Sequence, residues 1–291
     1  MSASSIEIWV NEIADQREFR QAVHTILYAI SQHRELQDLM ILKGGILLGL
    51  AYASTRFTRD IDFSTDQTLQ QIEPNELIDE LDTALVEAVE ALGYGIDCRV
   101  QGWKQKPPGE DKEFASLKIS VGYADQNNLG AHRRLQNGKS PHAVKIDFSL
   151  NEPRGEPVAM ELDHNQTIQT YSFHDLVAEK FRALLQQQQR KRFRRQDTYD
   201  LYGLLSEEKV STDILIKAQI LLSLKEKANA RNLEVEKESM RNPEIARRSK
   251  AQYNLLEQEI QGELPKFDEA YGYIMNYYES LPWEAEENPT D

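Results

Sequence analysis

A two-glycine turn followed by a pair of aspartates is the feature that most constrains how this chain can fold. Residues 43–45 (Lys-Gly-Gly) open a short apolar segment, 46–53, and a basic stretch then leads to residues 59–63 (Arg-Asp-Ile-Asp-Phe). Alternate side chains of an extended strand share a face, so Asp60 and Asp62 should point together while their apolar neighbours enter a core. The pattern predicts a turn, a short helix and a half-buried strand in succession.

This pattern has the parts that a magnesium-bound nucleotide needs. Glycines let the backbone approach a phosphate, and the N-terminus of the following helix favours its negative charge. Carboxylates are the hard oxygen ligands that Mg²⁺ takes. A solvated strand edge is the alternative interpretation, because an Asp-x-Asp pair alone has little specificity.

A third carboxylate lies on a later strand, predicted over residues 143–150. There Lys145 and Asp147 share one face, and the alternate apolar residues share the other. If this strand neighbours the first, Asp60, Asp62 and Asp147 could converge on one or two Mg²⁺ ions. The first two would then hold the metal that carries the triphosphate. Asp147 would hold a second metal or accept the proton of the attacking hydroxyl.

Lys180 is a further candidate, because it falls on the apolar face of a helix predicted over residues 172–189. A lysine there must reach solvent or meet a negative group, either a triphosphate or a carboxylate from a neighbouring helix or Glu179. Asp197 and Asp200 follow, three residues apart. They could orient Lys180 or contact a nucleotide; for Asp200 we favour helix capping and surface ion pairs.

A basic run follows Lys180 in an otherwise acidic chain. It would suit nucleotide phosphates or an RNA backbone, or it could be a solvated helix end. The run contains Arg182, Arg190, Lys191, Arg192, Arg194 and Arg195.

Composition narrows the class of protein. The net charge of −14 argues against tight, non-specific nucleic-acid binding by the whole surface, although a local basic groove remains compatible with it. The single cysteine, Cys98, excludes an intramolecular disulfide and a cysteine zinc cluster. The N-terminal residues lack a signal-peptide pattern, and the most apolar stretch, 40–53, is too short to cross a bilayer. We therefore expect a cytoplasmic protein with no membrane partner.

The predicted organisation is α/β (α+β): a mixed sheet with helices over residues 1–170, an α-helical domain over 171–282 and a disordered acidic tail over 283–291. The segment 225–261 is strongly charged and suggests a long exposed helix or a partly mobile stretch. Predicted helices of the first domain are 15–33 and 76–92; predicted strands are 59–64, 95–101, 114–123, 143–150 and 158–162; 103–111 and 124–141 are predicted loops.

Five motifs in one order resemble the AbiEii/AbiGii-type toxins, members of the DNA polymerase β-like nucleotidyltransferase superfamily. The resemblance spans roughly residues 40–205. The motifs are Lys43-Gly44-Gly45, Arg56-x-Thr58-x-Asp60-Ile61-Asp62-Phe63, Lys145-Ile146-Asp147, Ala178-Glu179-Lys180 and Asp197-Thr198-Tyr199-Asp200-Leu201.

The resemblance implies a nucleotidyltransferase-type sheet domain with a Mg²⁺ site, an NTP substrate and a helical domain that closes over the nucleotide. It also implies a toxin of a toxin–antitoxin or phage-defence system, paired with an antitoxin encoded alongside. By motif, Asp60, Asp62 and Asp147 fall at the metals, and Lys180 at a phosphate. The residues assigned to the nucleotide are Lys43, Gly44, Gly45, Arg59, Lys180 and Asp197.

The leading hypothesis is a Mg²⁺-dependent toxin that adds nucleotides to an RNA acceptor, with tRNA as the first candidate. One alternative uses the same site to modify a small molecule or a protein. The other is a nucleotide-binding module without turnover, for which the charged segment 225–261 would be a docking surface.

Overall fold

The computed structural model describes residues 6–109, 112–163, 166–206 and 212–283 and divides into two compact units. The first contains residues 1–53, 58–152 and 156–171; the second contains residues 172–291 together with two short segments, 54–57 and 153–155. The predicted boundary after residue 170 places these two segments in the first domain instead. Within the described residues, no helix has both the length and the apolar character needed to cross a membrane.

A seven-stranded mixed sheet forms the first unit, in the order β3-β4-β5-β2-β1-β7-β6. Strand β2 runs parallel to β5 and antiparallel to β1, and β1 runs parallel to β7. The strands are β1 (Ile41–Lys43), β2 (Asp60–Ser64), β3 (Ile96–Lys106), β4 (Ser116–Asp125), β5 (Ala143–Ser149), β6 (Val158–Asp163) and β7 (Gln166–Thr170).

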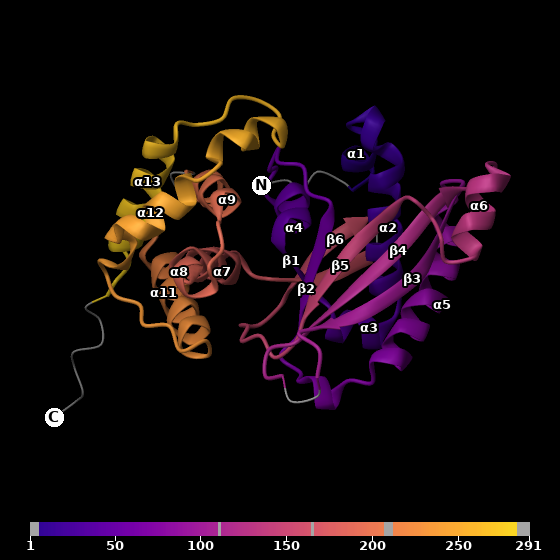
Figure 1. Ribbon diagram of the computed structural model, residues 1–291, viewed down its shortest axis with the longest axis horizontal. Coiled ribbons are helices and arrows are strands. Elements are labelled where there is room, and N and C mark those ends of the chain that lie inside the picture. Colours follow the sequence, from indigo (N-terminus) through magenta and orange to yellow (C-terminus); the bar gives the residue numbers. More distant parts are fainter. Residues whose placement is uncertain (1–5, 110–111, 164–165, 207–211, 284–291) are drawn as a thin grey trace. The chain divides into compact units, whose positions relative to one another are not determined.

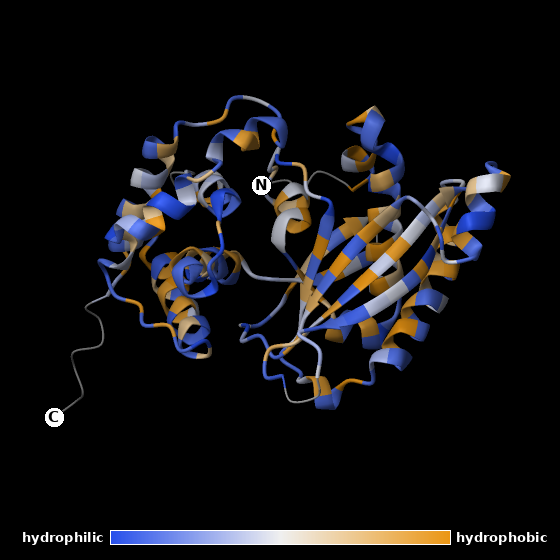
Figure 2. Ribbon diagram, in the orientation of Figure 1, coloured by the Kyte–Doolittle hydropathy of each residue, from blue (hydrophilic) through white to orange (hydrophobic). Residues whose placement is uncertain are grey.

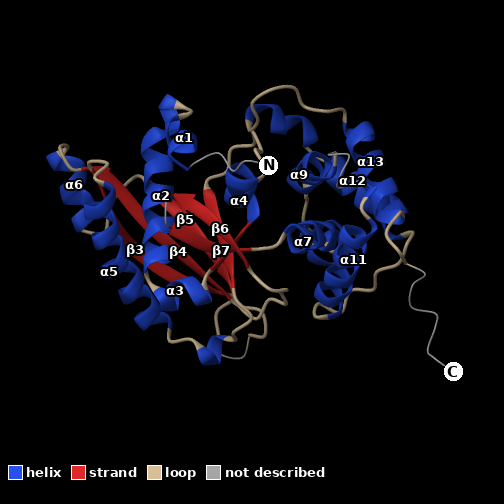
Figure 3. Ribbon diagram, turned by 180° about the vertical axis from the view of Figure 1, so that it is seen from behind, coloured by secondary structure: helices blue, strands red, loops and turns tan. Residues whose placement is uncertain are grey.

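Helices α2 (Arg17–Gln32) and α5 (Pro74–Leu92) cover one face of this sheet (Figures 1 and 3). Apolar and polar residues alternate along the strands, as Figure 2 shows. This alternation buries one set of side chains under the helices, which gives the unit its core. The remaining helices of the unit are α1 (Ile6–Asn11), η1 (Ala14–Gln16), α3 (Arg34–Leu39), α4 (Gly44–Ala51), η2 (Leu69–Gln71) and α6 (Leu129–Gln136).

Three predictions for this unit need correction. Residues 103–106, predicted as a loop, extend β3, because the turn sequence Pro107-Pro108-Gly109 ends the strand later than expected. Helix α6 lies within the segment 124–141, which was predicted as turns; Asn128 caps it by accepting a hydrogen bond from the backbone N–H of Ala131. Strand β7 was not predicted.

Helices make up the second unit. Their order is α7 (Phe173–Leu185), α8 (Gln187–Arg190), α9 (Arg195–Leu205), α11 (Ile214–Asn229), η3 (Ser239–Arg241), α12 (Pro243–Lys250), η4 (Tyr253–Gln258) and α13 (Phe267–Glu279). Ser172 caps α7 by accepting a hydrogen bond from the backbone N–H of Asp175, as its position predicts. Asp175 also accepts from Ser223 at 2.5 Å and from the backbone N–H of Gly155 at 3.1 Å, which ties α7 to α11 and to the segment 153–155.

Of the two alternatives for residues 225–261, the structure contradicts the long exposed helix. The segment forms the end of α11, two 3-10 turns and the short helix α12. Four of its sparse apolar side chains, Met240, Ile245, Tyr253 and Leu256, are each no more than 5% exposed, whereas Leu255 is 39% exposed. Widely spaced apolar residues thus anchor short elements rather than a long exposed helix. Of the predicted tail, residues 284–291 lie outside the described residues; Trp283 is described, and its indole N–H donates to the carbonyl of Tyr278 at 2.9 Å.

Candidate active site

Asp60 and Asp62 lie on β2, whose alternate residues Ile61 and Phe63 are fully buried. The two aspartates therefore share the opposite face, as the alternation predicts. Asp60 is exposed and Asp62 is half-buried. They have different neighbours, because Asp60 is opposite Lys145 in the β2–β5 pairing, whereas Asp62 is opposite Asp147.

Asp147 on β5 is thus the direct cross-strand neighbour of Asp62. Neighbouring strands are about 4.8 Å apart, so these two residues, opposite each other on one face of the sheet, have their side chains next to each other. One Asp147 oxygen, Oδ2, forms an ion pair with Lys118, the residue opposite it on β4. The other, Oδ1, is buried and accepts no hydrogen bond from the described residues. A buried acceptor of this kind is costly unless a donor or a cation meets it.

In the part of the chain that the structure describes, no group of three or more His, Cys, Asp or Glu side chains is arranged to hold a metal ion. The expected convergence of all three aspartates is therefore not formed in advance. The close pair is Asp62 with Asp147, and Asp60 lies two register positions away, opposite Lys145.

The glycine turn lies against Asp62. Gly44 begins α4 with φ +73°, and a Cβ at this position would lie 2.7 Å from Cγ of Asp62. At Gly45 a Cβ would lie 2.9 Å from Cγ2 of Thr58. Both positions exclude a side chain, so the turn brings bare backbone to the carboxylate pair at the start of a helix.

Replacing Gly44 by Ala should displace Asp62 as well as strain the backbone. The left-handed conformation costs a non-glycine residue about 1–2 kcal/mol. Gly138→Ala is the matched control, because Gly138 has φ +69° and nothing within 4 Å of an added Cβ. We expect similar backbone strain in urea unfolding but a loss of enzymatic activity only in Gly44→Ala. Equal activity in the two variants would show that Asp62 tolerates the displacement.

Lys43 and Arg59 border these residues. Lys43 is the cross-strand neighbour of Asp62 on β1; it is buried, and its Nζ lies 5.6 Å from the centroid of the Tyr171 ring, within cation–π range. Arg59 is exposed and directly precedes β2. The sheet therefore brings Lys43, the glycine turn, Asp62 and Asp147 together, whereas the assignment of Arg59 to the nucleotide stays a prediction.

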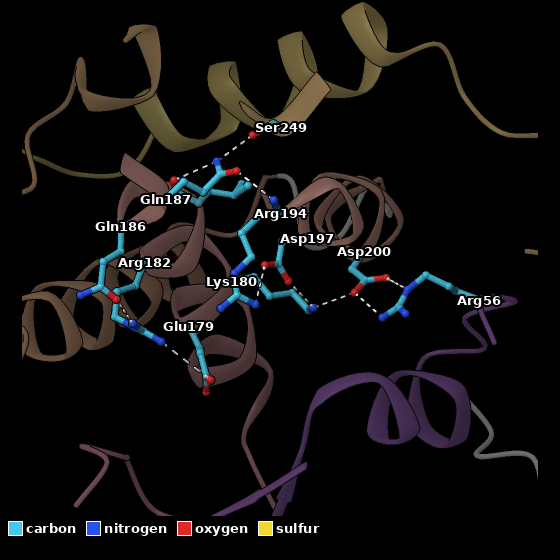
Figure 4. A network of polar contacts seen from close by, with 11 residues as sticks. Arg56, Glu179, Lys180, Arg182, Gln186, Gln187, Arg194, Asp197, Asp200 and Ser249 are labelled. Atoms are coloured by element: carbon cyan, nitrogen blue, oxygen red, sulfur yellow. Dashed lines mark hydrogen bonds and ion pairs between the residues drawn. The ribbon is translucent and has the colours of Figure 1, made fainter. Parts of the chain in front are cut away.

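Lys180 and Asp197 belong to the second unit, where a buried polar network holds them (Figure 4). The Lys180 ammonium donates to Asp197 at 3.1 Å and to Asp200 at 2.7 Å. Arg56 donates two hydrogen bonds of 2.9 Å to the two oxygens of Asp200. Of the alternatives for Lys180, the structure thus shows bonding to carboxylates of a neighbouring helix; its assignment to a phosphate stays a prediction, as does that of Asp197 to the nucleotide.

Asp200 corrects a sequence-based preference for helix capping and surface ion pairs. Its side chain is fully buried and joins two cations. Burial alone would raise the pKa of this carboxyl, but the charges of Lys180 and Arg56 outweigh burial and hold the pKa below its usual value. Burial likewise works against the charged form of Lys180, and its two carboxylate partners keep the pKa above the usual lysine value. The network is therefore charged at neutral pH.

The basic run after Lys180 is partly neutralised within its own unit. Arg194 forms an ion pair with Asp197 at 3.7 Å, and Arg195 forms one with Glu259 at 2.7 Å. Arg182 donates to Gln186 at 2.8 Å. The exposed members are Arg190, Lys191 and Arg192. The run does not present six free cations to a phosphate chain.

Two contacting residues received no role from the sequence. Lys118 was placed on the polar face of its strand, but its pairing with Asp147 depends on the β4–β5 register. Arg56 occurs in the motif before Asp60, yet its partner Asp200 is 144 residues away. The only sequence signal for Lys118 was its place between two serines, Ser116 and Ser120, at alternate positions of the strand.

The mixed sheet, with its glycine turn and two carboxylates opposite each other on neighbouring strands, has the nucleotidyltransferase fold. Residues 25–273 match the family described as nucleotidyl transferase AbiEii toxin, type IV toxin–antitoxin system. The chain belongs to this family and is a nucleotidyltransferase. The family's toxin–antitoxin assignment implies a nucleotide substrate and an antitoxin partner. The resemblance read from the motifs is thereby confirmed.

Two solved structures share the fold at low sequence identity, and a third is similar over most of its length with a lower TM-score. A Helicobacter pylori protein assigned as a nucleotidyltransferase is 13% identical with a TM-score of 0.50, over 95% of this chain and 100% of its own. JHP933 of Helicobacter pylori is 12% identical with a TM-score of 0.52, over 94% and 95%. MenT4, a nucleotidyltransferase toxin of Mycobacterium tuberculosis, is 15% identical with a TM-score of 0.45, over 95% and 97%. No curated protein matches the chain.

Proposed function

We propose that this nucleotidyltransferase toxin moves a nucleotide from an NTP to an RNA acceptor, with tRNA as the first candidate, in a Mg²⁺-dependent reaction. The observation that supports it best is the register pairing of Asp62 with Asp147 beside the glycine turn. Nucleotidyl transfer needs positioning and charge neutralisation more than covalent chemistry from the protein, and this site offers both.

The donor set suits Mg²⁺. This ion keeps several waters and is usually bound by one or two carboxylates together with substrate phosphates, so a three-carboxylate cage is unnecessary. Asp62 and Asp147 would hold it, with the buried Oδ1 of Asp147 as an available oxygen, and Asp60 would assist from two residues along the same face of β2. When bound, Mg²⁺ would neutralise phosphate charge and polarise the phosphoryl group.

The chain's own groups would orient the two substrates. The bare backbone at Gly44 and Gly45 and the N-terminus of α4 favour a triphosphate there. If Asp62 held the metal without Asp147, Asp147 would instead accept the proton of the attacking hydroxyl. Lys118 would then have to exchange its bond to Asp147 for one to the acceptor or the leaving phosphate.

A transfer assay tests the proposal. Purified protein and Mg²⁺ are incubated with each of the four α-labelled NTPs in turn and with total RNA, and Asp60→Ala serves as the blank. We expect label in a tRNA-sized band with one NTP and none in the blank. Chelation of divalent ions with EDTA should remove the band as well.

The other outcomes separate the alternatives. Label on the protein or on a small molecule would mean that this protein or molecule, and not RNA, is the acceptor. Nucleotide binding without any label would contradict the proposed transfer and favour a binding module. In cells, we propose action as a toxin in the cytoplasm, held in check by its antitoxin, with phage defence as the setting.

A further inference from the structure

The face of the sheet that carries Asp62 and Asp147 continues over β4 and β3 as a surface of lysine and small residues. Register pairing places Lys104, Lys118, Asp147 and Asp62 in one row across four strands. Helices α2 and α5 lie behind the sheet in Figure 1, which looks onto this opposite face. The positions of this face on β3 and β4 that lie nearest Asp147 are Gly102, Lys104, Lys106, Ser116, Lys118 and Ser120; farther along, the face continues with the pairs Arg99–Gly122 and Asp97–Ala124.

We call Lys104, Lys106, Lys118 and Lys145 the lysine face. Lys104, Lys106 and Lys145 are exposed, and the Lys118 side chain is 34% exposed. Lys145 donates to Ser120 at 2.6 Å, so its ammonium lies over β4. The serines and the glycine have short side chains or none, so at these positions the lysine side chains extend furthest from the sheet.

The local charge contrasts with that of the whole protein. Residues 99–145 contain nine Lys and Arg but four Asp and Glu, whereas the chain contains 34 and 48. At the far end of the same face, α6 packs over Gly122, where a Cβ would lie 2.9 Å from Leu135. Arg133 and Arg134 of α6 are exposed there. The positive surface therefore extends from the carboxylate pair to α6.

Protection of a sheet edge explains only part of this pattern. Lysines on edge strands discourage pairing with other chains, and β3 is the edge strand that carries Lys104 and Lys106. Lys118 and Lys145 lie on internal strands, where no edge needs protection. A protein partner is also a poor fit, because the part of this face on β3 and β4 that lies nearest Asp147 consists of lysine, serine and glycine and lacks the aromatic and apolar residues of protein interfaces.

We propose that the lysine face binds the phosphate backbone of the RNA acceptor and leads its end to Asp147. This inference rests on the proposed function. Adjacent strands are about 4.8 Å apart, so the Lys104 backbone lies about 10 Å from that of Asp147, two strands away. That span corresponds to about three stacked nucleotides of one strand. Lys118 lies between them, at the point where the last phosphate would arrive.

The test measures binding of a fluorescent, end-labelled tRNA by anisotropy at several salt concentrations, without NTP. In Lys104→Gln/Lys145→Gln, we expect weaker binding and a slope of log K against log[salt] that is smaller by about two, one for each lost phosphate contact. Lys104→Arg/Lys145→Arg should retain the wild-type slope. The matched control is Arg17→Gln/Arg34→Gln, which removes two exposed cations from helices α2 and α3 and should change nothing.

Transfer kinetics provide the second readout. The glutamine variant should raise KM for tRNA and leave KM for the NTP unchanged; a raised KM for the NTP with an unchanged salt slope would assign these lysines to the triphosphate and overturn the proposal. Wild-type protein that does not bind tRNA would also overturn it.

If the slope falls as expected but no variant transfers label, the lysine face stands and the proposed reaction is wrong. If wild type transfers label to tRNA and the glutamine variant binds it with an unchanged slope, only the lysine face is wrong.

Discussion

Asp62→Asn is expected to lower kcat/KM for nucleotide transfer by about 10³-fold or more while leaving the fold intact. The substitution keeps the shape of the side chain and removes the charge that lies beside Asp147. Electrostatic and metal-ion contributions of several kcal/mol correspond to such a factor, since each 1.36 kcal/mol is tenfold in rate. Steady-state transfer of label, with circular dichroism to verify folding, measures it. Growth inhibition in cells should disappear with the activity.

A second substitution distinguishes a joint role from two separate ones. Groups that act as a unit are strongly non-additive, so Asp62→Asn/Asp147→Asn should be about as inactive as either single variant. Asp79→Asn is the matched control, because Asp79 is an exposed aspartate on α5. Near wild-type transfer by Asp62→Asn would remove the carboxylate pair from the mechanism, whatever the control showed.

Local alternation was sufficient to predict which face each carboxylate occupies. In both β2 and β5 a charged or polar residue follows each core residue, and a shift of one position would bury the aspartates and expose Phe63 or Phe148. The sequence therefore predicted the orientation of Asp60, Asp62 and Asp147. It could not predict that β2 and β5 run parallel with Asp62 opposite Asp147, because pairing depends on contacts between segments more than eighty residues apart.

The same limit explains what was missed. The lysine face depends on the β3–β4 and β4–β5 registers, and both of its β3 members, Lys104 and Lys106, fall in residues 103–106, where a nearby proline pair suggested a loop. The second unit shows a related effect. Lys180 on an apolar helix face predicted a negative partner, which the structure supplies, but Arg56 reaches Asp200 from a distant segment. The sequence pattern thus predicts that a buried charged residue needs a partner, but only the folded structure identifies which residue that partner is.

Asp200→Asn is expected to destabilise the second unit by about 3–5 kcal/mol, the cost of removing one member of a buried charge network. The substitution leaves Lys180, which is 7% exposed, with Asp197 alone, and Arg56 without its bidentate acceptor. Native-state hydrogen exchange of the α7 and α9 amides in the full chain measures the loss. Asp268→Asn is the matched control: it also removes an aspartate bonded to a lysine, Lys250 at 2.8 Å, but at an exposed site worth less than about 1 kcal/mol.

The pH dependence of the stability difference between wild type and Asp200→Asn tests whether charge is its cause. The folded-state pKa of Asp200 lies below its ordinary value of 3.8, so unfolding in acid takes up a proton. The stabilisation by the charged carboxylate is therefore complete above about pH 4 and is lost as the pH falls through the folded-state pKa. Lys180 has a raised pKa, so its contribution is complete below 10.5 and is lost only as the pH rises through its folded-state value. The difference between wild type and Asp200→Asn should therefore be constant from about pH 5 to 9 and shrink below pH 4. A difference that persisted undiminished in acid would mean that Asp200 stabilises α7 and α9 by shape and hydrogen bonding, with its charge contributing nothing.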